Sequence, residues 1–225
     1  MGTFLDSLHR RPLWHRLHGI AATLVLAGCT TTAAVHGARE QEPLAIRQDA
    51  RVGIVYTGAW RGAEYADPLV RVPFGQASVT RLDQAFAALF SATTRLPDWP
   101  PWRSALPPVD GVIEVDVASM SVSAGTDYKR PETASVLLVP PIPERLDQVT
   151  IRYHACFMQP GGQVVACWEA TAQSDHQRGA LESYPKSVAE AADRAMSGAT
   201  AKLLLTIEND PEVKAWLASI SKAGH

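Results

Sequence analysis

The chain has no marked excess of charge of either sign and no basic stripe. Its 21 lysine and arginine residues stand against 23 aspartate and glutamate residues, and no aromatic side chains interleave with a basic cluster. Proteins that bind nucleic acid usually carry such a cluster, so we expect no nucleic-acid partner. Internal repeats are absent too, which excludes the repeat architectures that stack copies of one unit.

Long hydrophobic runs are also missing. The apolar stretch Gly19–Ala27 has nine residues, whereas a helix needs about 20 apolar residues to cross a bilayer. A basic run that includes Arg10, Arg11 and Arg16 precedes it. This layout is typical of a signal peptide rather than of a membrane-spanning helix. No later run is long enough to span a bilayer.

Cysteine is scarce, with three in the chain, and the first closes the apolar stretch. The sequence Leu26-Ala27-Gly28-Cys29 resembles the lipobox of bacterial lipoproteins. This resemblance implies cleavage before Cys29, diacylglycerol on its thiol and a third acyl chain on its amino group. Three chains would hold the protein on a membrane, because each buried methylene contributes about 0.8 kcal/mol. The alternative is a short buried apolar helix with an interior cysteine.

The residues after the cysteine indicate a destination and a domain organisation. Thr30 stands where aspartate would signal retention, which implies release to the outer membrane, with the domain facing the periplasm. We expect a signal peptide at 1–28, a lipidated cysteine with a flexible tether at 29–47, and a single α+β periplasmic domain at 48–225. Residues 1–28 hold three arginines and one aspartate, which leaves 18 basic and 22 acidic residues after cleavage.

Strand and helix patterns alternate along the first half of that domain. Alternating apolar residues predict a strand at Arg51–Tyr56, and apolar residues at helical spacing predict a helix from Ser78 to about Thr93, with Ser78 as its cap. The alternation in 111–125 changes phase partway, which indicates a bulge. A short apolar strand ended by prolines is expected at 135–143.

Two helices are predicted to close the chain. The first begins with a capping box of Ser187 and Glu190, and its apolar stripe runs to Ile207. The second begins at Asp210-Pro211-Glu212. The order strand, helix, strands, helix predicts an α+β two-layer sandwich, with helices packed on one face of a mostly antiparallel sheet.

A hairpin carries the other two cysteines. Odd residues from Val149 to Phe157 are apolar, and Val164, Ala166, Trp168 and Ala170 repeat the pattern on the return strand. Matching these faces places Cys156 opposite Cys167, with a four-residue loop at 160–163. Such a pair suits a disulfide in an oxidising compartment, and closing this short loop stabilises the fold by about 2 kcal/mol.

Two chemical alternatives can be read from the same region. His154, Cys156 and Glu169 share the outer face and have the residue types of a thiol nucleophile with a base. The competing interpretation is a cross-strand polar pair beside a disulfide. Asp127, Asp175 and His176 lack the spacing of metal ligands. We therefore expect no enzymatic activity, no metal and no cofactor.

Together these features resemble small outer-membrane lipoproteins of the lipopolysaccharide-assembly, YajG and curli-secretion amino-terminal types. The resemblance implies a non-enzymatic, lipid-anchored accessory protein that binds a partner in an envelope assembly or transport complex. Trp99 and Trp102, on a proline-rich loop, are the candidate contact. They can equally pack over the end of the helix from Ser78. The second functional hypothesis is a lipid- or glycan-binding lipoprotein.

Overall fold

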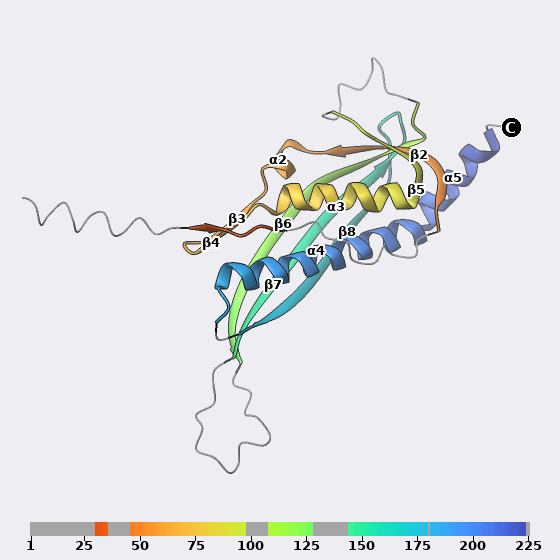
Figure 1. The fold of residues 1–225 in the computed structure, drawn as a ribbon. Helices are drawn as coiled ribbons and strands as arrows, with labels where there is room; N and C mark the ends of the chain where they lie inside the picture. Colours follow the sequence, from red (N-terminus) through yellow and green to blue (C-terminus); the bar gives the residue numbers. More distant parts are fainter. Residues whose placement is uncertain (1–29, 36–45, 98–107, 128–143, 180, 224–225) are drawn as a thin grey trace, which may run out of the picture.

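The computed structural model describes residues 30–35, 46–97, 108–127, 144–179 and 181–223. Its main sheet has five strands in the order β5-β2-β6-β7-β8 (Figure 1). The strands are β2 (Gln48–Tyr56), β5 (Phe90–Arg95), β6 (Gly111–Asp127), β7 (Glu144–Met158) and β8 (Val164–Arg178). β2 runs parallel to β5 and β6, whereas β7 is antiparallel to both of its neighbours.

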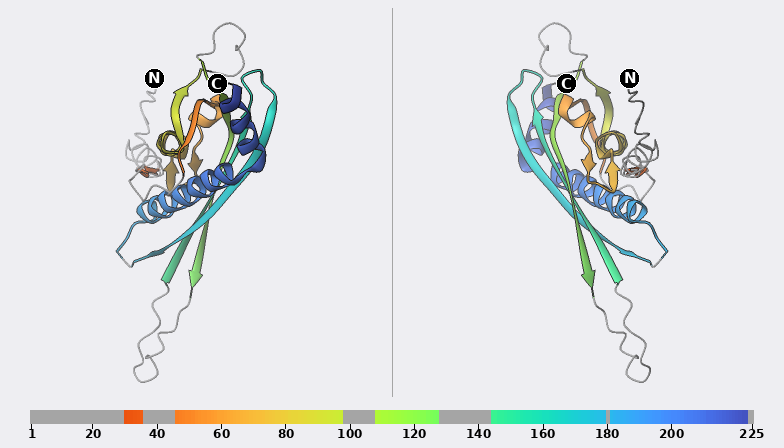
Figure 2. Two further views of the ribbon diagram at one scale, coloured as in Figure 1. Left: turned by 90° about the vertical axis from the view of Figure 1, so that its right-hand side faces the viewer. Right: turned by 90° about the vertical axis from the view of Figure 1, so that its left-hand side faces the viewer.

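Helices α3 (Phe74–Leu89) and α4 (Tyr184–Asn209) pack on one face of this sheet (Figures 1 and 2). The predicted α+β fold with helices on one face is confirmed. Helix α5 (Pro211–Ala223) follows as predicted, and a four-residue helix, α2 (Gly58–Arg61), follows β2. None of the described helices is both long and apolar enough to span a membrane.

A second, small sheet lies beside the main one. It consists of β1 (Thr31–Thr32), β4 (Val70–Val72) and β3 (Tyr65–Ala66), in that order. The flexible tether expected at 29–47 is therefore wrong for residues 30–35, because Thr31 and Thr32 pair with β4 and Ala33 is buried. Residues 36–45 of that tether lie outside the described residues.

The core lies between the main sheet and the two long helices. Every odd residue of β7 from Val149 to Phe157 is buried, as the alternation predicted. The predicted stripe of α4 is buried as well, from Val188 to Ile207. A smaller cluster of Val55, Leu96, Val112 and Met158 covers part of the opposite face. Buried apolar area on both faces explains why β2 is apolar at consecutive positions.

Both predicted helix caps are wrong, for a shared reason. Helix α3 begins at Phe74 and α4 at Tyr184, four and three residues before the predicted caps. Ser78 is buried and accepts a hydrogen bond from the hydroxyl of Tyr153 at 2.9 Å. The hydroxyl of Ser187 donates to the carboxylate of Asp147 at 2.5 Å. Each serine serves a partner on β7 rather than the end of its own helix.

Two predictions for the strands can also be compared with the structure. The pairing of β6 with β7 shifts between Val115 and Val117, so the predicted bulge is confirmed. Residues 90–93, predicted as helix, belong to β5 instead, because the chain turns at Phe90 to pair with β2. The apolar strand expected at 135–143 lies outside the described residues.

Gly75, in the first turn of α3, is predicted to tolerate no side chain. A Cβ there would lie 2.1 Å from the carbonyl oxygen of Trp60. Gly75→Ala should therefore lower the free energy of unfolding by about 1–3 kcal/mol, through overpacking. Chemical denaturation measures this, with Gly62→Ala as control, because no atom lies within 4 Å of a Cβ at Gly62. Equal stability of the two variants would contradict the close approach.

Candidate functional site

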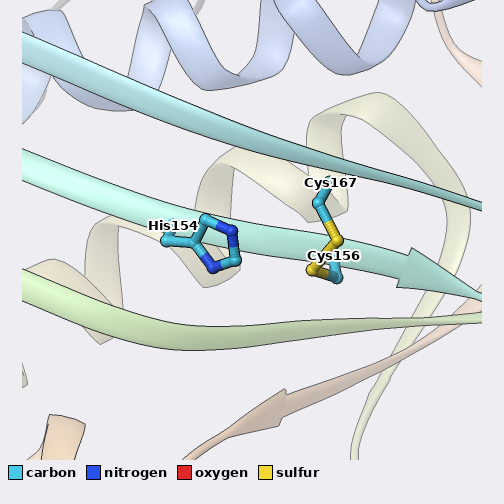
Figure 3. Close-up of side chains that lie close together, drawn as sticks. All are labelled: His154, Cys156 and Cys167. Atoms are coloured by element: carbon cyan, nitrogen blue, oxygen red, sulfur yellow. A yellow bond between two sulfur atoms is a disulfide. The ribbon is translucent and has the colours of Figure 1, made fainter. Parts of the chain in front are cut away.

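The disulfide between Cys156 and Cys167 lies on the outer face of the β7–β8 hairpin (Figure 3). The predicted register is confirmed: Ala155 lies opposite Trp168 and Cys156 opposite Cys167. The two cysteine Cα atoms are 4.0 Å apart, slightly less than the 4.4 Å at which the usual range for disulfides begins. The cross-link thus joins two strands whose pairing the apolar faces already specify.

The turn of this hairpin differs from its prediction. The register shifts after Phe157, so that Met158 pairs with Val164 and an extra residue enters β8. This shift turns Val164 to the surface, where it is 53% exposed, although its alternation placed it in the core. Residues 159–163 connect the strands, one more than predicted, and the carbonyl of Gln163 accepts a hydrogen bond from the amide of Gln159.

The alternative of a thiol nucleophile fails on the geometry of the same face. The sulfur of Cys156 is bonded to Cys167 and offers no thiolate. His154 lies beside the disulfide (Figure 3), opposite Glu169 in the ladder. The carboxylate of Glu169 pairs with Arg152 at 3.3 Å, and both side chains are about half exposed. The face therefore has the cross-strand polar character of the competing interpretation.

A second polar cluster joins the end of β8 to the start of α4. His176 contacts the carboxylates of Glu182 at 2.9 Å and Glu190 at 3.3 Å. Lys186 lies within 3.5 Å of both carboxylates. Arg194 contacts Nδ1 of the imidazole at 2.9 Å, and Glu182 contacts Nε2. The hydrogen bond from His176 lowers the pKa of Glu182, against the opposing effect of burial.

These contacts argue against a metal centre at His176, although three side chains that can ligate a metal, one imidazole and two carboxylates, meet there. Lys186 already supplies positive charge to both carboxylates, and Arg194 occupies Nδ1 of the imidazole. A buried pair stands next to this cluster: Asp147 is fully buried and lies 3.4 Å from the guanidinium of Arg178. These interactions fix the first turns of α4 on the sheet.

Asp67 performs a similar role where β3 turns into β4. Its carboxylate accepts hydrogen bonds from the amides of Leu69 and Val70, both at 2.7 Å, and from the hydroxyls of Tyr65 and Tyr184 at 3.2 and 3.0 Å. Burial by itself raises the pKa of Asp67, but these donors outweigh it, and the net direction is downward. Burial, together with the hydrogen bond to Asp67, raises the pKa of Tyr184.

The surface feature with the clearest capacity to bind is the second edge of β6. β2 pairs with β6 only from Gly111 to Val115, whereas β6 continues to Asp127. Beyond Val115, no strand in the described part of the chain pairs with this edge. Figure 2 shows the far half of β6 and β7 projecting past the helices. An unpaired strand edge presents backbone amides and carbonyls that can pair with another strand.

Hairpin geometry identifies which backbone groups point to this edge. The close Cα approach of Cys156 and Cys167 marks a pair without mutual hydrogen bonds, so even residues of β7 direct their amides toward β6. Their partners on β6 include Ser119, Ser121, Ser123 and Gly125. The residues between these partners direct their amides and carbonyls away from β7. They are Met120, Val122 and Ala124.

The other edges of the main sheet are covered by cationic side chains. On β8, Lys202 donates to the carbonyl of Thr171 at 3.4 Å, and Arg194 donates to that of Asp175 at 3.0 Å. β5 has only six residues, and Arg47 donates to its first two carbonyls. Lysine, arginine and short length are common means of blocking edge pairing. Residues 119–125, Ser-Met-Ser-Val-Ser-Ala-Gly, contain neither a charge nor a proline.

A groove of about 380 Å³ lies between β1 and the first turns of α4. Its lining is mixed: Thr31, Thr32, Ser183, Lys186, Glu190 and Asp193 are polar, and alanines and Pro185 supply the remainder. This groove is at the margin of the helix layer, whereas the sequence hypothesis placed a ligand cleft between the helices and the sheet. The space between α4 and the sheet is instead filled by core side chains.

The predicted site residues fall into two groups. Cys156 and Cys167 are brought together as expected, whereas Cys29, Trp99 and Trp102 lie outside the described residues. The β6 edge was missed, although one signal pointed to it. The alternating pattern of 111–125 is far longer than that of Arg51–Tyr56. A strand at Arg51–Tyr56 is therefore too short to pair with the whole length of a strand at 111–125.

No family model and no curated protein matches the chain. Among solved structures, it is similar to protein XCC0632 from Xanthomonas campestris, with a TM-score of 0.51 and 12% identity over 87% of this chain and 100% of that one. This likeness shows a shared fold and nothing further.

Two other solved structures have lower scores. One is a neuraminyllactose-binding hemagglutinin homolog from Helicobacter pylori, with a TM-score of 0.43 and 11% identity over 84% of this chain and 98% of that one. The other is uncharacterized lipoprotein B from Nitrosomonas europaea, with a TM-score of 0.39 and 13% identity over 79% of this chain and 90% of that one. Their scores are too low to extend the comparison beyond noting that a bacterial lipoprotein is among them.

Removing the disulfide should destabilise the protein by a modest amount. Replacing Cys156 and Cys167 with alanine should lower the free energy of unfolding by about 2 kcal/mol, because the closed loop is short. Denaturation under non-reducing conditions measures the loss. The pair Thr150→Ala and Gln173→Ala, opposite each other on the same strands, is the control. Free thiols at both cysteines in the folded, oxidised protein would contradict the cross-link.

Proposed function

We propose that this protein is a lipid-anchored, non-enzymatic accessory protein of the bacterial outer membrane, and that it binds a partner protein by strand addition to β6. The observation that carries this proposal is the contrast between sheet edges. Arg194 and Lys202 cover carbonyls along β8, whereas the described contacts include none that covers the β6 edge at 119–125. An edge left open over this length is suited to pairing with a strand.

The side chains around the edge define the partner segment. Met120 and Val122 are half-buried and face the core side, whereas Ser119, Ser121 and Ser123 are exposed on the other face. A strand added here would continue both faces. We therefore expect an extended segment whose apolar side chains alternate with polar ones, because apolar side chains would cover Met120 and Val122. Backbone hydrogen bonds would supply affinity, at about 0.5–1.5 kcal/mol each.

We also propose that the protein has no enzymatic activity. The cysteine and the carboxylate that first suggested catalysis are used in a disulfide and in an ion pair with Arg152. The His176 cluster is neutralised by Lys186 and Arg194. Each of these groups has a structural explanation, and neither cluster combines a nucleophile with a free base.

We also propose Trp99 and Trp102 as a second contact with the partner. The chain places them between β5 and β6. Their replacement by alanine tests them in the partner-recovery experiment described for the β6 edge. Retained recovery with a lower melting temperature would assign these indoles to packing rather than to binding, since loss of a buried aromatic side chain costs about 3–5 kcal/mol.

The groove between β1 and α4 supports a second candidate function, the binding of a glycan or a lipid headgroup. Its threonine, serine and charged side chains are the groups that hydrogen-bond such ligands. Recovery of the protein alone from solubilised envelope, with a bound sugar or lipid, would favour this candidate over a protein partner.

A proline on the open edge should prevent partner binding. Ala124→Pro removes an amide that points away from β7, so it should abolish partner recovery from detergent-solubilised envelope and leave the melting temperature within a few degrees. Gln177→Pro on the β8 edge is the matched control and should bind normally. Unchanged recovery of the partner with Ala124→Pro would refute the β6 edge as the binding site. If the protein instead forms a concentration-dependent dimer that Ala124→Pro abolishes, the strand added to β6 belongs to a second copy of this chain.

Lipidation at Cys29 is the other testable part of the proposal. Mass spectrometry of the mature protein should show Cys29 as the first residue, carrying three acyl chains. Cys29→Ala should shift the protein away from the outer-membrane fraction, because no acyl anchor would form. A Cys29→Ala variant that still fractionates with the outer membrane would contradict anchoring at this residue.

A further inference from the structure

The folded domain begins almost immediately after Cys29. The amide of Thr31 donates to the carbonyl of Leu69 at 3.4 Å, and that of Ala33 donates to Arg71 at 2.8 Å. Ala33 is 5% exposed. Only Thr30 lies between Cys29 and Thr31, and an extended chain spans at most about 3.5 Å per residue. Two residue steps therefore tether any lipid attached to Cys29 within about 7 Å of Thr31.

The direction of β1 identifies the end of the domain at which the cysteine emerges. β1 is parallel to β4, with Thr31 opposite Val70. The start of β1 is therefore at the same end as the start of β4, where the turn from β3 arrives. Figure 1 shows this turn beside the start of β1. A flexible tether of 18 residues would not fix which end of the domain lies next to the cysteine, because such a tether spans about 25 Å on average.

The turn at this end presents an apolar tip. Leu69 is 63% exposed, and the neighbouring Pro68 is exposed as well. The carboxylate of Asp67 is directed inward, where two amides and two tyrosine hydroxyls donate to it. The charged group of the turn is thus held away from its outer surface.

A second exposed leucine lies in the connection that Tyr184 ties to the same turn. Leu181, in the connection that precedes α4, is fully exposed. It stands three residues before Tyr184, whose hydroxyl donates to Asp67 at 3.0 Å. One carboxylate therefore links the β3–β4 turn to the connection that carries Leu181. A single exposed leucine needs no explanation. Here, however, two exposed leucines belong to linked segments at the end of the domain from which the chain leads to Cys29 and its proposed lipid.

We propose that Leu69 and Leu181 insert into the lipid surface beside the acyl chains of Cys29, and that this contact holds the domain in one orientation on the membrane. The inference rests on the proposed lipidation of Cys29. The reach of about 7 Å matches the depth of roughly 5–10 Å at which apolar side chains enter the interface. The anchor supplies membrane attachment, and the two leucines supply the orientation.

Depth-sensitive labelling of the lipidated, full-length protein tests the contact. Leu69→Cys, Leu181→Cys and Leu205→Cys variants carry an environment-sensitive fluorophore in vesicles of phosphatidylethanolamine and phosphatidylglycerol. Leu205 is the control, because it is 47% exposed and lies 21 residues along α4 from Tyr184, about 30 Å away. Labels at 69 and 181 should shift to the blue and be quenched by lipid-chain quenchers, whereas the label at 205 should report water.

The outcomes separate this inference from the anchoring on which it rests. Vesicle flotation is measured first. If the protein floats and all three labels report water, the orientation is wrong while lipid anchoring stands. If it floats and all three report lipid, the domain lies on the membrane without the specific contact, which also overturns the inference. If it does not float, lipid anchoring itself is refuted and the inference falls with it.

Discussion

Strand β7 pairs with β6 and β8 along its whole length, and its alternating side chains determine both faces of the sheet. The odd residues lie beneath α3 and α4, where the hydroxyl of Tyr153 donates to Ser78 and burial raises the pKa of Tyr153 to about 12. The even residues carry the disulfide and the exposed polar face. The same alternation directs the amides of Met120, Val122 and Ala124 to the open edge. A one-residue slip would invert all of these positions.

The parts of the fold that were predicted correctly are those specified by local repetition. Apolar alternation placed Cys156 opposite Cys167, and a change of phase indicated a bulge in β6, although the register shifts before Val117 rather than after it. What failed depends on contacts that are distant in sequence. Ser78 and Ser187 carry the sequence signals of helix caps, but Tyr153 and Asp147 use their hydroxyls. Residues 30–35 have no pattern of their own, and their pairing with β4 and the burial of Ala33 order them.

The candidate binding edge, too, can be predicted from the sequence only in part. Sequence alone gives strand lengths, and the excess of β6 over β2 implies an unpaired segment. It does not reveal that Arg194 and Lys202, more than fifteen residues away from the carbonyls they contact, cover the edge of β8. Distinguishing an open edge from a covered one requires the packing of α4 on the sheet. Function in such a fold is decided by which backbone groups the helices leave accessible.

The separation of the two cysteines has a consequence for the order of folding. The two cysteines are only 11 positions apart in the sequence, so the bond can form as soon as the hairpin has emerged from a ribosome or a translocation channel. Helices α4 and α5 follow it in the chain and arrive later. A closed hairpin would then present the apolar side of β7 and β8, with Trp168 on it, to the arriving helices. The nitrogen of that indole donates to Asp210 at 2.8 Å, and Asp210 in turn accepts the first amides of α5. A covalent bond made early thereby prepares the surface on which the last segment of the protein docks.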